Sequence, residues 1–243
     1  MEKRIIARGL LAGAIASVAA FVFARTFVEP VIAKAIAYEE AQEAGHEHGV
    51  ELFTRGVQAN IGMGFGVLAF GVAMGALFAV AYCVAYGRVG NLSPRLLSVL
   101  LAGGMFLSLY VVPFLKYPAN PPAVSLDETI RQRTLLYLLM VVLSAALLAG
   151  AVWLGRSLLE RFDTWSASLI AAAAYVVAIS VVMLALPTID ETPEDFPADV
   201  LYDFRLYSLG TQLVLWALIA VVFGSSVQRL LGESKRQETF AEA

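Results

Sequence analysis

The chain has 243 residues, of which 59% are hydrophobic and only 15% are charged, and its mean hydropathy is +0.75. A soluble domain is typically about half apolar and about one-quarter charged, so this composition excludes a protein folded around one water-shielded core. The net charge is −3, and no basic run offers a surface for nucleic acid. The single cysteine, Cys83, excludes a disulfide framework within the chain.

Six stretches of the sequence contain no Asp, Glu, Lys or Arg. A helix needs about 20 apolar residues to cross the hydrocarbon core of a bilayer, and all but the first stretch have that length. The first, between Arg8 and Arg25, can cross if both arginines reach toward the interfaces. We therefore predict an all-α polytopic helix bundle, a single membrane domain over residues 1–243, with spans at about 7–27, 57–86, 96–115, 134–155, 165–187 and 206–228.

The first stretch also allows a second interpretation, a cleaved signal peptide, because basic residues precede it. Its glycines favour a retained helix. Gly9 and Gly13 are four residues apart, and small residues at this spacing let membrane helices approach closely. The second predicted span repeats the spacing at Gly71 and Gly75. We expect both helices to pack closely against neighbours.

Lysine and arginine lie mainly on one side of the predicted spans. Ten of the 17 fall in the two termini and in the segments 87–95 and 156–163. Six fall in the predicted outer loops 28–56, 116–133 and 188–205, and the seventh, Arg25, lies at the outer end of the first span. The positive-inside rule places the more basic side in the cytoplasm. We therefore expect a multi-pass protein of the cell membrane with both termini cytoplasmic.

Both histidines of the chain lie in the first outer loop, two residues apart among carboxylates. Imidazole and carboxylate are suitable ligands for a divalent transition metal. Residues two apart do not share a helix face, so one ion can take both histidines only where the chain leaves the helix. The candidate metal ligands are His46, His48, Glu39, Glu43 and Glu47. A solvated acidic loop that binds nothing is the alternative.

The other two outer loops are rich in proline. Residues 113–122 contain four prolines and an asparagine, and residues 187–197 contain three prolines among several carboxylates. Proline fixes φ and removes a donor, so we expect a rigid, non-helical cap over the outer ends of the spans. The basic residues of these loops cannot ligate a cation, and we expect them to pair with Glu29, Glu191 or Asp195. Ordinary connecting loops are the alternative.

Recognisable catalytic motifs are absent from the sequence. It contains no P-loop, no G-x-S-x-G, no H-E-x-x-H and no C-x-x-C. The six charge-free stretches carry no ionisable side chain apart from Cys83 and tyrosines, whereas ion pathways usually contain such groups. The membrane-embedded methionines are ordinary core residues in this interpretation.

Several unusual motifs are distributed over most of residues 4–210. They are residues 8–13, Glu29-Pro30 before a His/Glu loop, Arg55 with Gln58, residues 113–124, Arg133 with Tyr137, Phe196-Pro197-Ala198, Phe204-Arg205 and Ser208. Together they resemble the CbtA family of predicted cobalt transporter subunits, and residues 113–124 are the most specific part. The resemblance implies a membrane subunit for cobalt uptake that works with a small single-span, histidine-bearing subunit, CbtB.

We therefore predict uptake of a divalent metal, with cobalt as the first candidate, by a chain that is not an enzyme and binds no cofactor tightly. The lipid bilayer and a CbtB-like subunit are its expected partners. The predicted outer mouth consists of Glu29, Arg55, Gln58, Asn60, Lys116, Tyr117, Asn120, Arg133 and Arg205. One alternative is an outer-face membrane enzyme acting on a phosphorylated or lipid-linked anionic substrate, which a ring of basic residues would suit. The other is a non-catalytic scaffold subunit.

Overall fold

A computed structural model describes residues 2–42, 54–90, 92–122, 124 and 127–241. This part of the chain is largely helical and contains no strand. Six of its helical segments are long and apolar enough to cross a membrane, which confirms the predicted all-α polytopic fold. They are Glu2–Gln42, Arg55–Ala85, Pro94–Lys116, Thr129–Leu158, Thr164–Ala185 and Ala198–Gly232.

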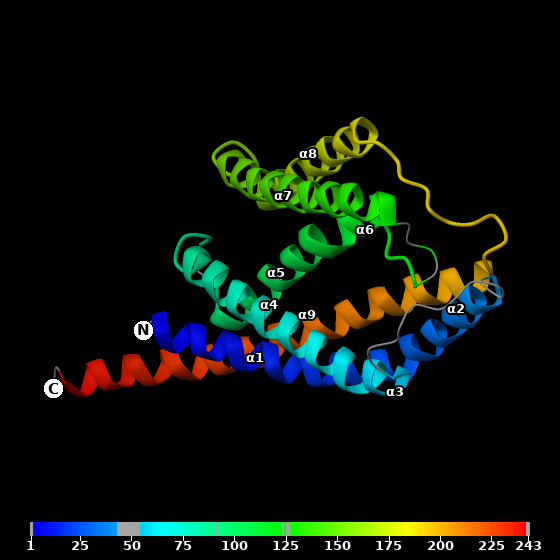
Figure 1. Cartoon of the computed structure of the whole chain (residues 1–243). Helices are drawn as coiled ribbons and strands as arrows, with labels where there is room; N and C mark the ends of the chain where they lie inside the picture. Colours follow the sequence, from blue (N-terminus) through cyan, green and yellow to red (C-terminus); the bar gives the residue numbers. More distant parts are fainter. Residues whose placement is uncertain (1, 43–53, 91, 123, 125–126, 242–243) are drawn as a thin grey trace. The chain divides into compact units, whose positions relative to one another are not determined.

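Several of these segments are interrupted by short π-helical turns, labelled η (Figure 1). In chain order the elements are α1 (Glu2–Phe23), η1 (Ala24–Val28), α2 (Glu29–Gln42), α3 (Arg55–Val57), η2 (Gln58–Gly62), α4 (Met63–Ala85), α5 (Pro94–Phe106), η3 (Leu107–Val111), α6 (Val112–Lys116), α7 (Asp127–Leu158), α8 (Thr164–Ala185) and α9 (Ala198–Ala241). They form two compact units, residues 1–103 with 202–243, and residues 104–201. The single membrane domain over 1–243 stays a prediction.

In the first unit, α1 and α4 pack antiparallel with their backbones in contact. Gly9 lies against Gly75, and a Cβ atom added to Gly13 would stand 2.1 Å from the carbonyl oxygen of Gly71. No side chain other than hydrogen fits there, so the two G-x-x-x-G stripes face each other. The Ser17 hydroxyl donates to the Gly13 carbonyl at 2.7 Å, which satisfies it inside the contact. The close packing predicted for both helices is confirmed.

Helix α9 also packs against α1, and it runs in the opposite direction. Arg8, near the start of α1, donates to the carbonyl oxygen of Ser226, and the rings of Phe27 and Tyr207 lie 5.6 Å apart at the other end. The beginning of the first predicted span therefore lies beside the end of the last one. A chain with six crossings has both ends on the same side of the membrane, and this arrangement agrees with that. Which side of the membrane carries the termini stays a prediction.

The second unit is built on an antiparallel pair, α7 and α8. The hydroxyls of Ser144 and Tyr175 form a hydrogen bond of 2.8 Å inside this pair. A small apolar core surrounds the bond and includes residues of α6 and of the segment after it: Val112, Tyr117, Met140, Tyr175 and Ile179. The core therefore fixes the start of the proline-rich segment against the two long helices.

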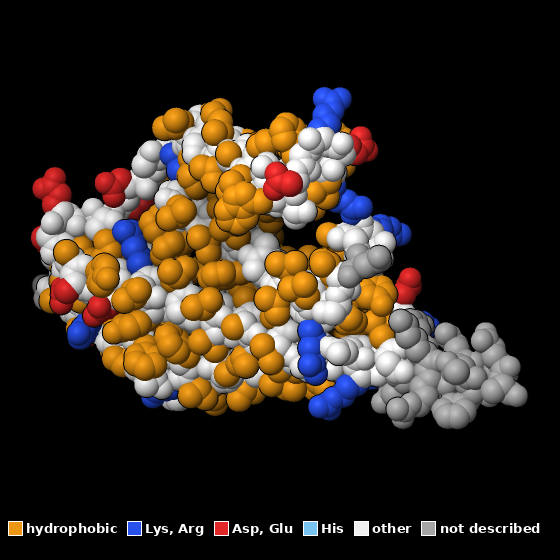
Figure 2. Space-filling model, turned by 180° about the vertical axis from the view of Figure 1, so that it is seen from behind, with side chains coloured by type: hydrophobic (Ala, Val, Ile, Leu, Met, Phe, Trp, Pro, Cys, Tyr) orange, Lys and Arg blue, Asp and Glu red, His pale blue; other side chains and the backbone are white. Residues whose placement is uncertain are grey.

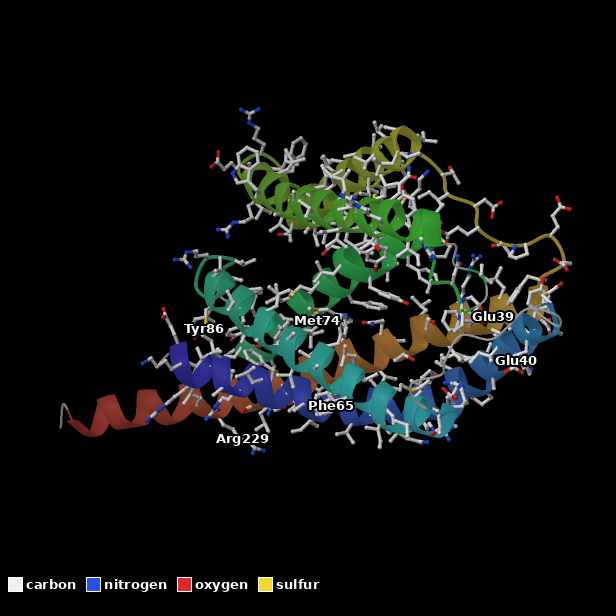
Figure 3. The ribbon with its side chains drawn as sticks, in the orientation of Figure 1. Glu39, Glu40, Phe65, Met74, Tyr86 and Arg229 are labelled. Carbon is white, nitrogen blue, oxygen red and sulfur yellow. The ribbon has the colours of Figure 1, made fainter. Side chains whose placement is uncertain are left out.

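Large apolar side chains cover much of the outer surface of these helices. Phe65 on α4 is 75% exposed and Leu184 on α8 is 86% exposed, and both lie in segments free of charge. Figure 2 shows hydrophobic side chains over much of one face, and Figure 3 labels Phe65 on α4. A water-soluble protein rarely exposes contiguous apolar patches of this extent, whereas lipid contact accounts for them.

The predicted outer loops contain more helix than we expected. Helix α2 occupies Glu29–Gln42 inside the predicted loop 28–56, because this stretch consists mostly of strong helix formers such as Ala, Glu and Gln. Its proline, Pro30, follows the turn η1 inside one continuous helical segment, so the carbonyl four residues before it loses its α-helical donor. The helices α7 and α9 likewise begin before residues 133 and 205. Pro113 lies within α6, inside the predicted span 96–115. The proline-rich residues 117–122 and 186–197 are non-helical, as predicted, whereas a rigid cap over the helix ends stays a prediction.

Candidate functional site

Three π-helical turns stand at helix ends that are predicted to face outside. They are η1 before α2, η2 before α4 and η3 before α6. A π-turn contains one residue more than an α-turn, so a backbone carbonyl loses its usual helical donor. Such turns are frequently found at functional sites.

At η3, a side chain replaces the missing backbone donor. The Val112 N–H donates to the Leu107 carbonyl, five residues back. The next residue, Pro113, has no N–H to offer the Leu109 carbonyl four residues before it. The Tyr137 hydroxyl donates to that carbonyl at 3.3 Å. Tyr137, which sequence reasoning placed only within the family resemblance, thus stabilises the proline-containing turn.

One polar contact joins the turns η1 and η2, and a second joins the helices beside them, α2 and α3. Arg25 Nε donates to Asn60 Oδ1 at 3.0 Å. Arg55 Nη2 forms an ion pair of 2.5 Å with Glu29 Oε1. Glu29 is only 7% exposed, whereas the Arg55 side chain keeps 39% of its surface exposed. The structure thus brings together three of the predicted mouth residues, and Gln58 is exposed at the start of η2.

In the second unit, a buried carboxylate collects three donors from the proline-rich segment and α7. Glu191, whose side chain is 1% exposed, pairs with Arg133 at 2.8 Å. It also accepts hydrogen bonds from Asn120 Nδ2 at 3.2 Å and from the Thr129 hydroxyl. Arg133 donates in addition to the Pro118 carbonyl. We call Glu191, Arg133, Asn120 and Thr129 the Glu191 cluster. The expected pairing of Arg133 with a third-loop carboxylate is confirmed.

Two neighbouring residues connect the same segments. The Tyr117 hydroxyl donates to the Pro187 carbonyl at 2.8 Å, and Lys116 Nζ donates to the Thr188 hydroxyl at 3.3 Å. Burial raises the pKa of the Tyr117 phenol above its ordinary value, so the phenol keeps the proton that it donates. The ammonium of Lys116 also lies 6.0 Å from the centre of the Tyr117 ring. Arg205 is half-buried on α9.

A cavity of about 480 Å³ opens beside the Glu191 cluster. Half of its lining residues are aromatic, and one carries a guanidinium. The lining comprises Tyr110, Phe114, Tyr117, Ala119, Ile130, Arg133, Thr134 and Tyr137. No carboxylate, imidazole or thiol lines it, so its donor set does not suit a metal ion. Sequence reasoning did not predict a cavity here. Residues three or four apart share a helix face, and this spacing between Tyr110, Phe114 and Tyr117, and between Ile130, Arg133 and Tyr137, could have indicated two facing surfaces.

Most of the predicted metal ligands lie outside the described residues: His46, His48, Glu43 and Glu47. Glu39 is half-buried near the end of α2, beside Glu40, which is exposed (Figure 3). In the described part of the chain, no three His, Cys, Asp or Glu side chains come together as a metal site. The metal function of the first loop therefore stays a prediction.

Six long apolar helices with lipid-exposed faces, and polar clusters at the helix ends, define a polytopic helical membrane protein. The profile of the CbtA family, described as a probable cobalt transporter subunit, matches residues 2–228. The chain therefore belongs to the CbtA family, as its motifs predicted. No curated protein and no solved structure matches it.

Proposed function

We propose that this protein is the membrane subunit for uptake of a divalent metal, with cobalt as the first candidate. The observation that carries the proposal is the family match over residues 2–228, which includes all six candidate spans almost completely. Membership of a family of transporter subunits supports a role in transport and a function that is not enzymatic.

In this proposal, the two outer regions have different tasks. The loop with His46 and His48, together with Glu39, Glu43 and Glu47, collects metal from dilute solution. The proline-rich segments form a rigid cap at the outer ends of the helices. The Glu191 cluster supports the second task, because one carboxylate holds residues from three places in the sequence. A buried pair with satisfied hydrogen bonds allows little movement.

The cationic residues of the cap also bear on the choice between transporter and enzyme. An enzyme for an anionic substrate needs unpaired basic groups that face its pocket. Arg133 does line the cavity, but its guanidinium already pairs with Glu191 and donates to Pro118. This favours a structural role for Arg133 and therefore transport. We place both termini in the cytoplasm, and we propose a small CbtB-like subunit as partner, with no tightly bound cofactor.

Uptake of radiolabelled cobalt tests the proposal directly. Cells or right-side-out vesicles that contain the chain are compared with cells or vesicles that lack it. Each comparison is made with and without a co-expressed small single-span subunit. We expect accumulation that saturates with cobalt concentration and is greatest with both subunits. Equal accumulation with and without the chain would refute the proposal. Stabilisation of the purified protein by phosphate or polyprenyl compounds, but not by metals, would favour the enzyme.

A further inference from the structure

Glu29 is a buried carboxylate with only one of its two oxygens paired. Oε1 receives the Arg55 guanidinium, whereas Oε2 is buried and accepts no hydrogen bond from any residue that the structure describes. A carboxylate normally accepts several hydrogen bonds, and leaving a buried acceptor unsatisfied is costly. An orphaned oxygen of this kind points to a ligand that comes from outside the chain.

The backbone just before Glu29 lacks two of the donors that an α-helix would supply. The Glu29 N–H donates to the Ala24 carbonyl, five residues back, so it does not serve the Arg25 carbonyl four residues back. The next residue, Pro30, has no N–H for the Thr26 carbonyl. The two carbonyls therefore lose their α-helical donors one turn before Glu29. Side chains on a helix lean back toward its N-terminus, so we expect the Glu29 carboxylate to lie on the side of this turn.

The comparison with η3 shows that this arrangement is not a necessary consequence of a π-turn followed by proline. There, the carbonyl four residues before Pro113 accepts a hydrogen bond from Tyr137. At η1, no described side chain donates to the equivalent carbonyl, that of Thr26. The chain thus supplies a side-chain donor at one of the two turns, whereas the described residues supply none to the Thr26 carbonyl at the other. Carbonyl oxygens beside a carboxylate are suitable ligands for a cation.

We propose that Glu29 Oε2 and the carbonyls of Arg25 and Thr26 form a binding site for the transported divalent metal, and that Arg55 competes with the metal for Glu29. This inference rests on the proposed function. Oxygen ligands suit hard and borderline divalent cations. A divalent ion replaces the single charge of Arg55 with a larger one, whereas a monovalent ion offers no such gain. Because Arg55 is 39% exposed, its guanidinium can move into water when metal enters.

In the sequence, the proposed site stands between the first apolar stretch and the predicted capture loop. Helix α2 has 14 residues and is therefore about 21 Å long, and the histidine loop follows its far end. Glu29 lies only four residues beyond Arg25, which bounds the first apolar stretch. Glu29 thus stands at the predicted outer interface of the first span.

Direct binding of Co²⁺ to the purified full chain in lipid nanodiscs, measured by titration calorimetry, tests this site. All variants carry His46→Ala and His48→Ala, so that the loop does not contribute. We expect Glu29→Gln to weaken binding at least about tenfold because the site loses its charged ligand. We expect Arg55→Gln to tighten it about tenfold because a competing cation is removed. Glu40→Gln, an exposed carboxylate on the same helix, is the matched control and should change binding less than about twofold.

Thermal unfolding gives an independent measurement. In Arg55→Gln, Glu29 is buried without a counter-ion, so we expect a lower melting temperature in chelator and a larger rise on adding Co²⁺ than in the parent. This result decides the matter even if Glu29→Gln does not fold. Unchanged Co²⁺ affinity in Glu29→Gln, or weaker affinity in Arg55→Gln, would overturn the site. Intact binding without any cobalt uptake would instead refute the proposed function and leave the site standing.

Discussion

Replacing Arg133 by Met should destabilise the second unit strongly. Glu191 would keep its hydrogen bonds from Asn120 and Thr129 but would lose its counter-ion while its side chain is 1% exposed. Removing one partner of a buried ion pair costs about 3–5 kcal/mol. Arg133 is itself 19% exposed, so we expect the lower end, about 3 kcal/mol. For a chain of this length, that lowers the melting temperature by about 6–12 °C.

The second change, Glu191→Gln, should restore part of the loss in the Arg133→Met background. A neutral amide needs no counter-ion, and its oxygen still accepts hydrogen bonds. Melting temperatures of the purified variants in one detergent, followed by near-ultraviolet circular dichroism, give the comparison. Arg131→Met is the control, because this exposed neighbour should change stability by less than about 0.5 kcal/mol. Two results would contradict this prediction: equal melting temperatures for Arg133→Met and Arg131→Met, or a melting temperature of the double variant below that of Arg133→Met. In either case the Arg133–Glu191 pair does not stabilise the cap.

Three further predictions concern packing, capture and topology. Gly13→Ala should prevent the close approach of the first two spans and reduce folded yield, since its Cβ would meet a backbone oxygen; Gly66→Ala on the same helix pair has open space and should be harmless on size-exclusion chromatography. Replacing His46 and His48 together by Ala should raise the cobalt concentration for half-maximal uptake several-fold and leave the maximum rate near its original value; an unchanged concentration dependence would make the loop a solvated segment. A cysteine at Ser234 should not react with an impermeant thiol reagent applied outside, and labelling there would reverse the orientation.

The number of candidate spans followed from the sequence alone. Partition of a segment between water and lipid depends on its own composition, so six charge-free stretches predict six membrane-length helices without knowledge of their contacts. The same holds for close packing at Gly9, Gly13, Gly71 and Gly75. Small residues at a spacing of four create a groove in any helix, although only the structure shows that these two stripes face each other.

The polar clusters were only partly predictable. Sequence reasoning placed Glu29, Arg55, Lys116, Asn120 and Arg133 at the outer helix ends, since each flanks an apolar stretch. It could not decide their partners. The choice depends on which helix faces are in contact, and this is set by packing over distances of many residues. The aromatic cavity belongs to the same category, because it exists only where two helices and the proline-rich segment meet.

The tertiary structure alone decided how the helix ends are built. The amino-acid composition and the spacing of apolar residues do not reveal the π-turns η1 and η3. A π-turn adds only one residue to a helix, which hardly changes the spacing of its apolar residues. Pro30 was predicted to lie in the first outer loop and Pro113 near the end of a span, whereas both lie within helical segments that contain a π-turn. The consequence is visible only in three dimensions. Tyr137 satisfies the carbonyl freed at η3, while at η1 a buried carboxylate oxygen of Glu29 is left without a described donor.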